Sequence, residues 1–270
     1  MRNLKLVLSW DGSNFKGFQI QPHVLTAQEV IQKSWKILTH EDVTLIGCSR
    51  LDAEVHAYRY VLNFKTATKL DRMKIIKSLN GIFYHEFKAA ISLLSADFVE
   101  DDFHSRFHAK GKHYRYLIWQ GVSEHALLTR RCFHVKCKNE IQNLPSIMAE
   151  YVGFHHFGAF RASDCFSQKL EKTIYEIDVW DHPHFSEMKM IDIWGDGFLK
   201  HMIRNMVGTA IDIATKKLSS DTIQKAFEHH NRTLTGVCAP GCGLTLMNVY
   251  YDEKVAKNEA ERKMREFVPC

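Results

Sequence analysis

The sequence predicts an α+β fold of two ferredoxin-like lobes, each with the order β-α-β-β-α-β, whose sheets join into one continuous mixed sheet. Three observations lead to this prediction. Segments with the two-residue periodicity of strands alternate with segments that have the 3.6-residue periodicity of helices. The order of these segments recurs along the 270 residues. No linker rich in Gly, Ser or Pro separates the two halves, which favours a rigid two-lobed body.

The first lobe is expected over residues 1–105. Its helices are indicated by caps, because Thr26 with Glu29 three residues later forms a capping box and Asp71 precedes the second helix. Its strands are indicated by alternating or short continuous apolar runs. The expected elements are a strand at 4–10, a helix after Thr26, strands at 43–47 and 60–64, a helix at 72–83 and a strand at 87–94.

The second lobe is expected over residues 106–252, and residues 253–270 form a charged tail that should be helical at 253–267. The tail is distinguished by its many charged residues. The lobe is distinguished because the order of strands and helices expected in the first lobe recurs in it. The expected elements of the lobe are strands at 114–119, 173–180, 188–194 and 244–251, and helices at 141–151, 200–215 and 220–230.

Composition describes an ordinary globular chain with a mild positive charge. Lys and Arg number 36 against 31 Asp and Glu, so the net charge of +5 is compatible with a polyanionic partner without requiring one. The seven cysteines have no framework spacing and indicate free thiols in the cytoplasm. No apolar run is long enough for a signal peptide or a membrane span. Neither HExxH nor paired CxxC is present, so no metal site is expected despite the 16 histidines.

The segment 48–57 holds the first candidate for chemistry. Asp52 lies between two strand-like runs, where a sheet turns back, and loops held by rigid strands often carry functional residues. In an extended chain Arg50 shares a side with Asp52 and can hold it as a carboxylate, which makes Asp52 a candidate nucleophile. The alternative is a surface ion pair or a turn aspartate.

Seven segments, in order and spacing, resemble motifs of the TruA family of tRNA pseudouridine synthases. The central segment is Ser-Arg-Leu-Asp-Ala-Glu-Val-His-Ala at 49–57, which is similar to that family's G/S-R-T-D-A-G-V-H-A signature. The other six lie at 10–21, 103–107, 112–116, 157–162, 197–208 and 239–246.

The resemblance implies a pseudouridine synthase fold with a basic central cleft, usually in a homodimer, and a tRNA substrate modified in the anticodon stem-loop at positions 38–40. It implies Asp52 as the catalytic aspartate, Tyr114 as the cleft tyrosine and Arg204 as the second-lobe arginine that pairs with Asp52. It also implies substrate contacts from residues in the matching motifs, namely Arg50, His56, Phe107, Arg161, Phe198 and Leu244.

Pseudouridine formation breaks the bond from ribose C1′ to uracil N1, turns the base and joins C1′ to C5. No atoms are lost and no redox change occurs, so no cofactor is expected. A carboxylate suits an electron-poor sugar carbon. The residues leave open whether Asp52 attacks C1′, attacks C6 of the base or takes a ribose proton.

The other two candidates have structural alternatives. Tyr114 can stack on an extruded uracil, and its alternative is a core tyrosine. Arg204 can hold Asp52 ionised, and its alternative is a solvated helix arginine, which the apolar residues around it disfavour. Basic and aromatic loop residues can grip phosphate and unstacked bases, although such runs are often only solvated surface.

The chain departs from the family pattern at Leu51, Glu54 and Asp196. If the pattern has glycine at position 54 for a positive φ or for close RNA approach, Glu54 should strain the loop or repel phosphate. The departures leave two alternatives to a tRNA enzyme of the usual kind. One is a divergent paralogue that acts on another RNA, and the other is a non-catalytic RNA-binding protein.

Overall fold

The computed structural model describes residues 1–88, 90–136 and 141–263. Within them the chain is an α+β protein whose strands pair both antiparallel and parallel, so the predicted α+β class with a mixed sheet is confirmed. The chain divides into two compact units. Unit 1 comprises Met1–Ala109 and Thr245–Tyr251, and unit 2 comprises Lys110–Leu244 and the segment that begins at Asp252.

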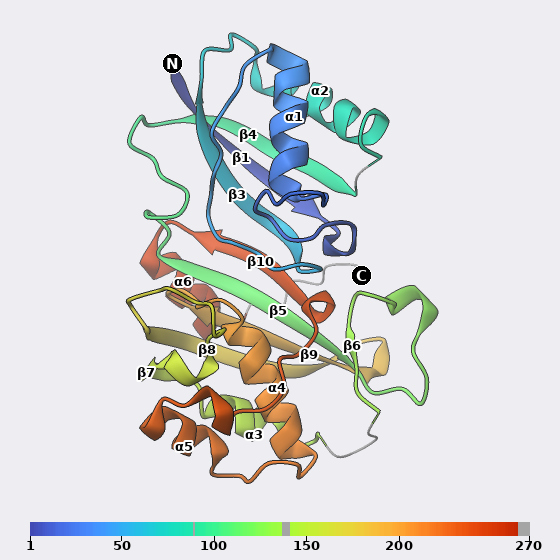
Figure 1. Cartoon of the computed structure of the whole chain (residues 1–270), viewed down its shortest axis with the longest axis vertical. Helices are drawn as coiled ribbons and strands as arrows, with labels where there is room; N and C mark the ends of the chain where they lie inside the picture. The colour runs from blue at the N-terminus through green and yellow to red at the C-terminus, as the bar shows by residue number, and fades with distance from the viewer. Residues whose placement is uncertain (89, 137–140, 264–270) are drawn as a thin grey trace. The chain divides into compact units, whose positions relative to one another are not determined.

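Unit 1 follows the predicted order of strands and helices from its N-terminus. Its elements are β1 Arg2–Trp10, α1 Ala27–Thr39, β2 Ile46–Gly47, β3 His56–Thr66, α2 Arg72–His85, β4 Ile91–Val99 and, far along the chain, β10 Leu244–Tyr250. β1 pairs antiparallel with β3 on one side and with β4 on the other (Figure 1). β10 adds to β3 in parallel. The expected boundaries grouped β10 with residues 106–252, because local periodicity carries no information on pairing between distant strands.

Both helices of unit 1 begin where their caps predict. The hydroxyl oxygen of Thr26 accepts from the backbone N–H of Glu29 at 3.4 Å, and the carboxylate of Asp71 accepts from that of Lys74 at 2.9 Å. Each bond satisfies one of the backbone donors that a helix start leaves open. α1 then buries the ring of Trp35, which meets the ring of Phe64 on β3 edge-on at 4.9 Å between centroids.

Three strands of unit 1 differ clearly from their predicted ranges. The strand expected at 60–64 is longer and forms β3, His56–Thr66. The strand expected at 87–94 begins at Ile91, because α2 continues to His85 and a short turn follows it. The strand expected at 43–47 pairs only at Ile46 and Gly47, opposite Asn63 and Leu62 of β3. An apolar run indicates burial, and strand pairing needs a neighbouring backbone as well.

Unit 2 has the strand order β5-β9-β8-β7, with β6 paired in parallel to β5. Its elements are β5 Gly111–Trp119, β6 Phe133–His134, α3 Leu144–Ala149, β7 Gly153–His156, β8 Glu171–His182, β9 Phe185–Gly195, α4 Met202–Ala214, α5 Thr222–His229 and α6 Glu253–Glu261. The predicted strands and helices are present, with α3 shorter than the expected 141–151. β6 and β7 were not predicted, since two and four residues are too few to show a period. The predicted helical tail is confirmed over α6, and its expected part beyond residue 263 lies outside the described residues.

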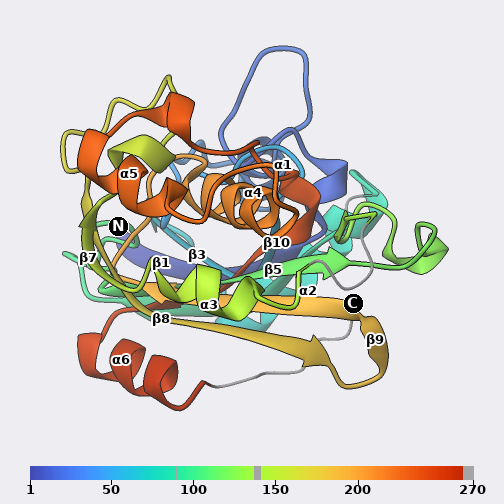
Figure 2. The ribbon, with the colours of Figure 1, turned by 90° about the horizontal axis from the view of Figure 1, so that it is seen from below.

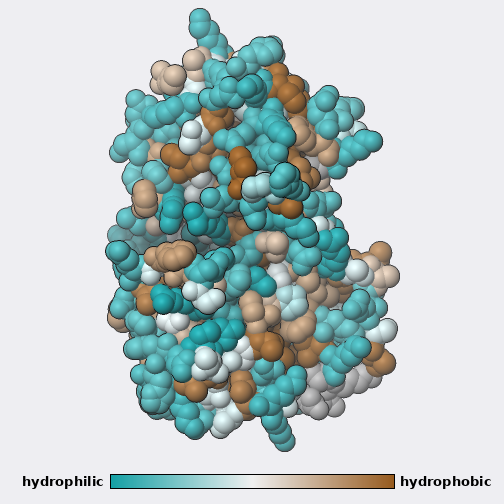
Figure 3. Space-filling view, viewed as in Figure 1, coloured by the Kyte–Doolittle hydropathy of each residue, from teal (hydrophilic) through white to brown (hydrophobic). Residues whose placement is uncertain are grey.

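The strands of unit 2 are covered on both faces. Figure 2 shows α4 and α5 on one side of β8 and β9 and α6 on the other. α4 is buried over almost its whole length, as the apolar neighbours of Arg204 predicted. Polar side chains cover most of the face seen in Figure 3, with apolar ones in small patches. None of the helices in the described ranges is both long and apolar enough to cross a membrane.

Candidate functional site

Asp52 lies on the loop between β2 and β3 of unit 1 and is half-buried. Its neighbour Leu51 is buried, and the carbonyl of Leu51 accepts from the backbone N–H of Phe18 at 3.0 Å. The N–H of Glu54 donates to the carbonyl of Phe15 at 3.3 Å. The loop backbone is therefore bonded to the segment 12–18 on both sides of Asp52, which limits its freedom.

Two glycines allow the segment 12–18 to approach this loop. A Cβ on Gly12 would overlap the backbone of Val55, which leaves no room for a side chain. Gly17 has φ +96, and a Cβ there would lie 2.9 Å from the carbonyl oxygen of Leu51. Glycine adopts this conformation without steric cost, so both residues serve the close contact beneath Asp52.

Glu54 adopts a left-handed conformation with φ 67, which is one of the two reasons considered for a glycine at this position of the family pattern. A residue with a Cβ is strained there, whereas glycine is not. The half-buried Glu54 is two positions from Asp52, so its carboxylate adds negative charge to this loop. The positive φ fulfils one of the two conditions under which Glu54 was expected to strain the loop, and the strain itself stays a prediction.

His56 supports the loop from below. Its ring is 7% exposed, and its Nδ1 accepts from the backbone N–H of Gly12 at 3.0 Å and lies 3.3 Å from Oδ1 of Asp11. The indole N–H of Trp10 donates to the carbonyl of Val55 at 3.3 Å. These bonds tie the start of β3 to the end of β1. The substrate contact expected of His56 stays a prediction, and its buried ring favours a supporting role.

Arg50 lies on the loop that precedes β3 and is exposed, in contrast to the buried His56. The residue before it is anchored, because the hydroxyl of Tyr60 donates to the carbonyl of Ser49 at 2.5 Å. The ring of Tyr60 lies 4.7 Å from that of Trp10 and 4.7 Å from that of Phe18. The residue before the exposed arginine is thus anchored to an aromatic cluster.

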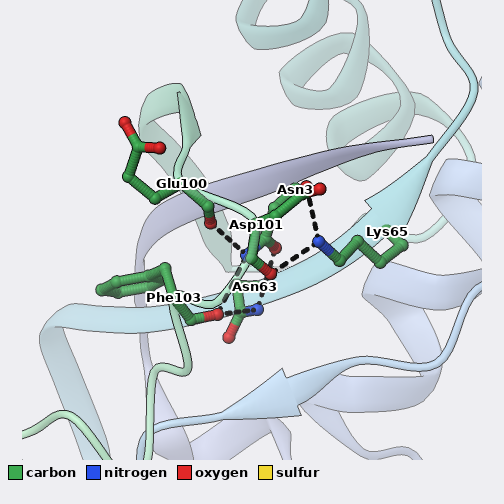
Figure 4. Close-up of polar contacts among 6 residues, drawn as sticks. All are labelled: Asn3, Asn63, Lys65, Glu100, Asp101 and Phe103. Carbon is green, nitrogen blue, oxygen red and sulfur yellow. Dashed lines mark hydrogen bonds and ion pairs between the residues drawn. The ribbon is translucent and has the colours of Figure 1, made fainter.

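Phe107 belongs to a segment of unit 1 that two buried amides hold in place (Figure 4). The side-chain N–H groups of Asn3 donate to the carbonyls of Glu100 and Phe103, each at 2.9 Å. Asn63 donates to the side-chain oxygen of Asn3 at 3.0 Å and to the carbonyl of Phe103 at 3.1 Å. Sequence reasoning missed both asparagines. Asn63 stands between the apolar Leu62 and Phe64 of β3, which was the available signal there, whereas Asn3 fits the alternating pattern of β1 and gave none.

Tyr114 and Phe198 are brought together in unit 2. Tyr114 is 4% exposed on β5, and its ring meets that of Phe198 edge-on, at 5.1 Å between centroids and 80° between planes. Phe198 is half-buried in the turn between β9 and α4. Two of the predicted site residues, distant in the sequence, therefore form one aromatic wall.

Arg204 lies on α4 and is half-buried. Its Nε donates to the carbonyl of Ala239 at 2.7 Å, and the N–H of Ala239 donates back to the carbonyl of Arg204 at 3.1 Å. The next residue, Pro240, accepts from the hydroxyl of Tyr116 at 2.8 Å, and burial raises the pKa of that tyrosine. The bond from Nε to the loop that leads to the buried Leu244 disfavours the alternative of a solvated helix arginine.

A buried carboxylate on the other face of β5 was missed by sequence reasoning. Asp192, fully buried, accepts from Nε and Nη2 of Arg115 at 2.9 and 3.0 Å and from the indole of Trp180 at 2.7 Å. It also lies 2.6 Å from Nε2 of His113. Burial by itself raises the pKa of Asp192, but its bonds to His113 and Arg115 outweigh burial and hold that pKa below its ordinary value. The alternation of His113 and Arg115 with Tyr114 was the signal for this second face.

Two remaining residues have simple surroundings. Arg161 is half-buried after the 3₁₀ turn Phe157–Phe160. Asp196 exchanges two hydrogen bonds with Thr173: its Oδ1 accepts from the backbone N–H at 3.1 Å, and its own N–H donates to the carbonyl at 3.0 Å. An asparagine side-chain oxygen could accept the same bond, so this departure preserves the local structure.

The predicted site residues thus form two groups. Unit 1 holds Arg50, Asp52, His56 and Phe107, and unit 2 holds Tyr114, Arg161, Phe198, Arg204 and Leu244. The pairing of Arg204 with Asp52 stays a prediction. Across residues 1–88, 90–136 and 141–263 no group of three or more His, Cys, Asp or Glu side chains could hold a metal ion.

Comparisons with known proteins agree with the motifs. A family model described as tRNA pseudouridine synthase matches residues 147–252. The tRNA pseudouridine synthase A of Thermoanaerobacter pseudethanolicus is 35% identical over 93% of this chain and 100% of its own length. That of Acetivibrio thermocellus is 36% identical over the same shares. Among solved structures, a chain of a Cbf5–Nop10–Gar1 complex matches 90% of this chain and 48% of its own, at 12% identity and a TM-score of 0.41.

Proposed function

The chain belongs to the tRNA pseudouridine synthase family, and from this premise we propose that it isomerises uridine in the tRNA anticodon stem-loop, at positions 38–40, with Asp52 as the catalytic carboxylate. The observation that carries the proposal is the Asp52 loop. Its carboxylate is half-buried, and the backbone on both sides of it is bonded to a second segment. A reactive group whose position is fixed before the substrate arrives needs no reorganisation during the reaction.

Each proposed catalytic side chain has one role in the reaction. Asp52 acts as the carboxylate that meets the electron-poor sugar carbon or the base. Tyr114, whose ring is backed by Phe198, stacks on the extruded uracil and brings its hydroxyl toward C5 as a proton acceptor or relay. Arg204 pairs with Asp52 and favours its charged form. The reaction needs no cofactor, because it exchanges one glycosidic bond for another.

The substrate is proposed to bind through residues of both units. Extruding a uridine from a stem requires groups that grip phosphate and replace the lost stacking. Candidate residues for these contacts are Arg50, His56, Phe107, Arg161, Phe198 and Leu244. We further propose that the enzyme works in the cytoplasm and that it is a homodimer. Light scattering of the purified protein tests the dimer directly.

The decisive experiment replaces Asp52 with asparagine, which keeps the shape of the side chain and removes its charge. Asp52→Asn should abolish pseudouridine formation on unmodified tRNA while tRNA affinity stays within about twofold of wild type. The matched control is Asp42→Asn, because the Asp42 side chain is 80% exposed and forms only a surface ion pair with Lys36. Turnover by Asp52→Asn comparable to that of wild type would refute the assignment of the carboxylate.

One observation favours a second candidate, a paralogue that acts on another RNA. Glu54 has a positive φ and carries a carboxylate two positions from Asp52, where the family pattern has glycine. Strain that persists at a functional loop points to a use for the residue that bears it. Mapping pseudouridine in tRNA and in total cellular RNA after incubation with the enzyme distinguishes the two candidates, since each names a different modified molecule.

A further inference from the structure

An exposed aromatic pair lies on unit 1, away from the Asp52 loop in the sequence. Phe107 is 71% exposed, and the ring of His104 lies 4.2 Å from its ring, tilted by 32°. Cζ of Arg106 lies 5.7 Å from the centroid of the Phe107 ring. We name His104, Arg106 and Phe107 the Phe107 platform.

The backbone of the platform is bonded to His104. Nδ1 of His104 accepts from the N–H of Arg106 at 3.2 Å and from that of Phe107 at 3.1 Å. The carbonyl of His104 accepts from the N–H of His108 at 3.0 Å. A neutral His104 ring that accepts at Nδ1 carries its hydrogen on Nε2, so the second nitrogen is a donor.

Buried groups fix the platform to the sheet of unit 1. Ser105 is fully buried, and its N–H donates to Oδ1 of Asn63 at 2.8 Å. The carbonyl of Ser105 accepts from the hydroxyl of Tyr251 at 2.9 Å. Figure 4 shows the hydrogen bonds that the side chains of Asn3 and Asn63 donate to the carbonyl of Phe103. The residues before and after His104 are therefore both held in place. The exposed ring therefore stands on a rigid support, which lowers the entropy that a ligand must remove on binding.

We propose that the Phe107 platform is a stacking site for one unpaired RNA base, distinct from the uridine that reacts at Asp52. The proposal rests on the proposed function, which has RNA as the ligand and Phe107 among its substrate contacts, and it deepens that contact by naming what the residue binds. An exposed ring offers a π-face that any base can cover, and stacking of this kind dominates binding to unpaired nucleotides. The guanidinium of Arg106, whose Cζ lies over the Phe107 ring at 5.7 Å from its centroid, is exposed and can turn to hold the phosphate of the stacked nucleotide.

The surrounding charges limit the ligand to a single nucleotide unit. Arg106 and His108 are exposed, but so are the carboxylate residues Glu100, Asp101 and Asp102. Asp101 is paired with Lys65, whose Nζ lies 2.7 Å from its Oδ1. Such a mixed surface would repel a long phosphate track, and it suits one base with one phosphate.

The experiment reports stacking through fluorescence. Phe107→Trp is introduced into the Asp52→Asn protein, so that RNA binds without turnover. Four of the five native tryptophans are buried and the fifth is half-buried, so the emission of an exposed tryptophan introduced at position 107 can be separated from theirs. Phe166→Trp in the same background is the matched control, because Phe166 is 94% exposed on a loop of unit 2.

The probes are an oligouridylate, an oligoadenylate and a blunt RNA duplex of the same length. The proposal expects both single strands to quench the emission of Phe107→Trp, the duplex to leave it unchanged, and the Phe166→Trp control to stay unchanged throughout. Phe107→Ala should weaken single-strand affinity about tenfold, and Phe107→Leu, which keeps an apolar side chain without a π-face, nearly as much.

Three outcomes would overturn the proposal. The first is RNA binding that leaves the emission of Phe107→Trp unquenched, and the second is equal quenching by the duplex. The third is a change in the emission of Phe107→Trp when protein concentration is raised without RNA. That change would assign this surface to a contact between copies of the chain. Failure of the proposed function is separately visible. If wild type forms no pseudouridine on any RNA but single strands still quench Phe107→Trp, the stacking site is supported and the proposed enzyme activity is refuted.

Discussion

Replacing Glu54 should separate backbone strain from charge in the Asp52 loop. Glu54→Gly and Glu54→Ala both remove the carboxylate, but only alanine keeps a Cβ at φ 67. The left-handed conformation costs a residue with a Cβ about 1–2 kcal/mol. Glycine gives back about 0.5–1 kcal/mol of this through the greater entropy of its unfolded chain. Glu54→Gly should therefore be more stable than Glu54→Ala by roughly 0.5–1 kcal/mol.

Urea unfolding measures this difference. With a slope of about 2 kcal/mol per molar urea, the midpoint of Glu54→Gly should lie roughly 0.3–0.5 M above that of Glu54→Ala. The control is the exposed neighbour Ala53, which is not among the residues with positive φ. Ala53→Gly should lower the midpoint, because there glycine brings only its entropy cost. An alanine variant at position 54 that is as stable as the glycine variant would refute the reasoning.

Charge is measured with a third variant, Glu54→Gln, which keeps the strain and removes the negative charge. If the carboxylate only opposes phosphate, Glu54→Gln and Glu54→Gly should both tighten tRNA binding by about twofold to fivefold, and less at high salt. If Glu54 reads another RNA by accepting a hydrogen bond from a base, both variants should lose activity on that RNA. Unchanged binding and activity on every RNA would show that the carboxylate serves neither purpose.

Three further predictions follow from the described contacts. Gly17→Ala should lower the unfolding midpoint and the turnover together, because its Cβ would lie 2.9 Å from the carbonyl of Leu51 at φ +96, and a Gly81→Ala control, where a Cβ meets nothing within 4 Å, should do neither. Asp192→Asn should destabilise unit 2 by about 3–5 kcal/mol, because it leaves Arg115 buried without its charge partner. The pKa of Asp192 is lowered in the folded protein, so this carboxylate stabilises the fold at pH values above the ordinary carboxyl pKa. That stabilisation is lost as the pH falls through the folded pKa. Asp192→Asn has no such carboxylate, so its stability should not show this decrease during acid unfolding. Affinity for tRNA should fall steeply between about 50 and 200 mM salt as Lys and Arg release counterions, and a flat dependence would contradict a phosphate grip.

The sequence by itself determined the features that depend on residues close together in the chain. Thr26 and Asp71 mark the starts of α1 and α2 because each caps a donor three residues away. The family pattern has glycine at position 54, and the positive φ of Glu54 in the structure agrees with one of the two reasons considered for that glycine. The same motifs, in order over most of the chain, identified the family, because each motif is a short local pattern.

Only the tertiary structure decided which distant residues meet. The side chain of Asn3 bonds to the carbonyl of Phe103, 100 positions away, and β10 pairs with β3 from the far end of the chain. Arg115 gave no sign that its partner is Asp192, since the register of β5 on β9 sets that contact. Hydrogen bonds and ion pairs of this kind depend on which strands pair, and the alternation of residues within one strand does not identify its neighbour in the sheet.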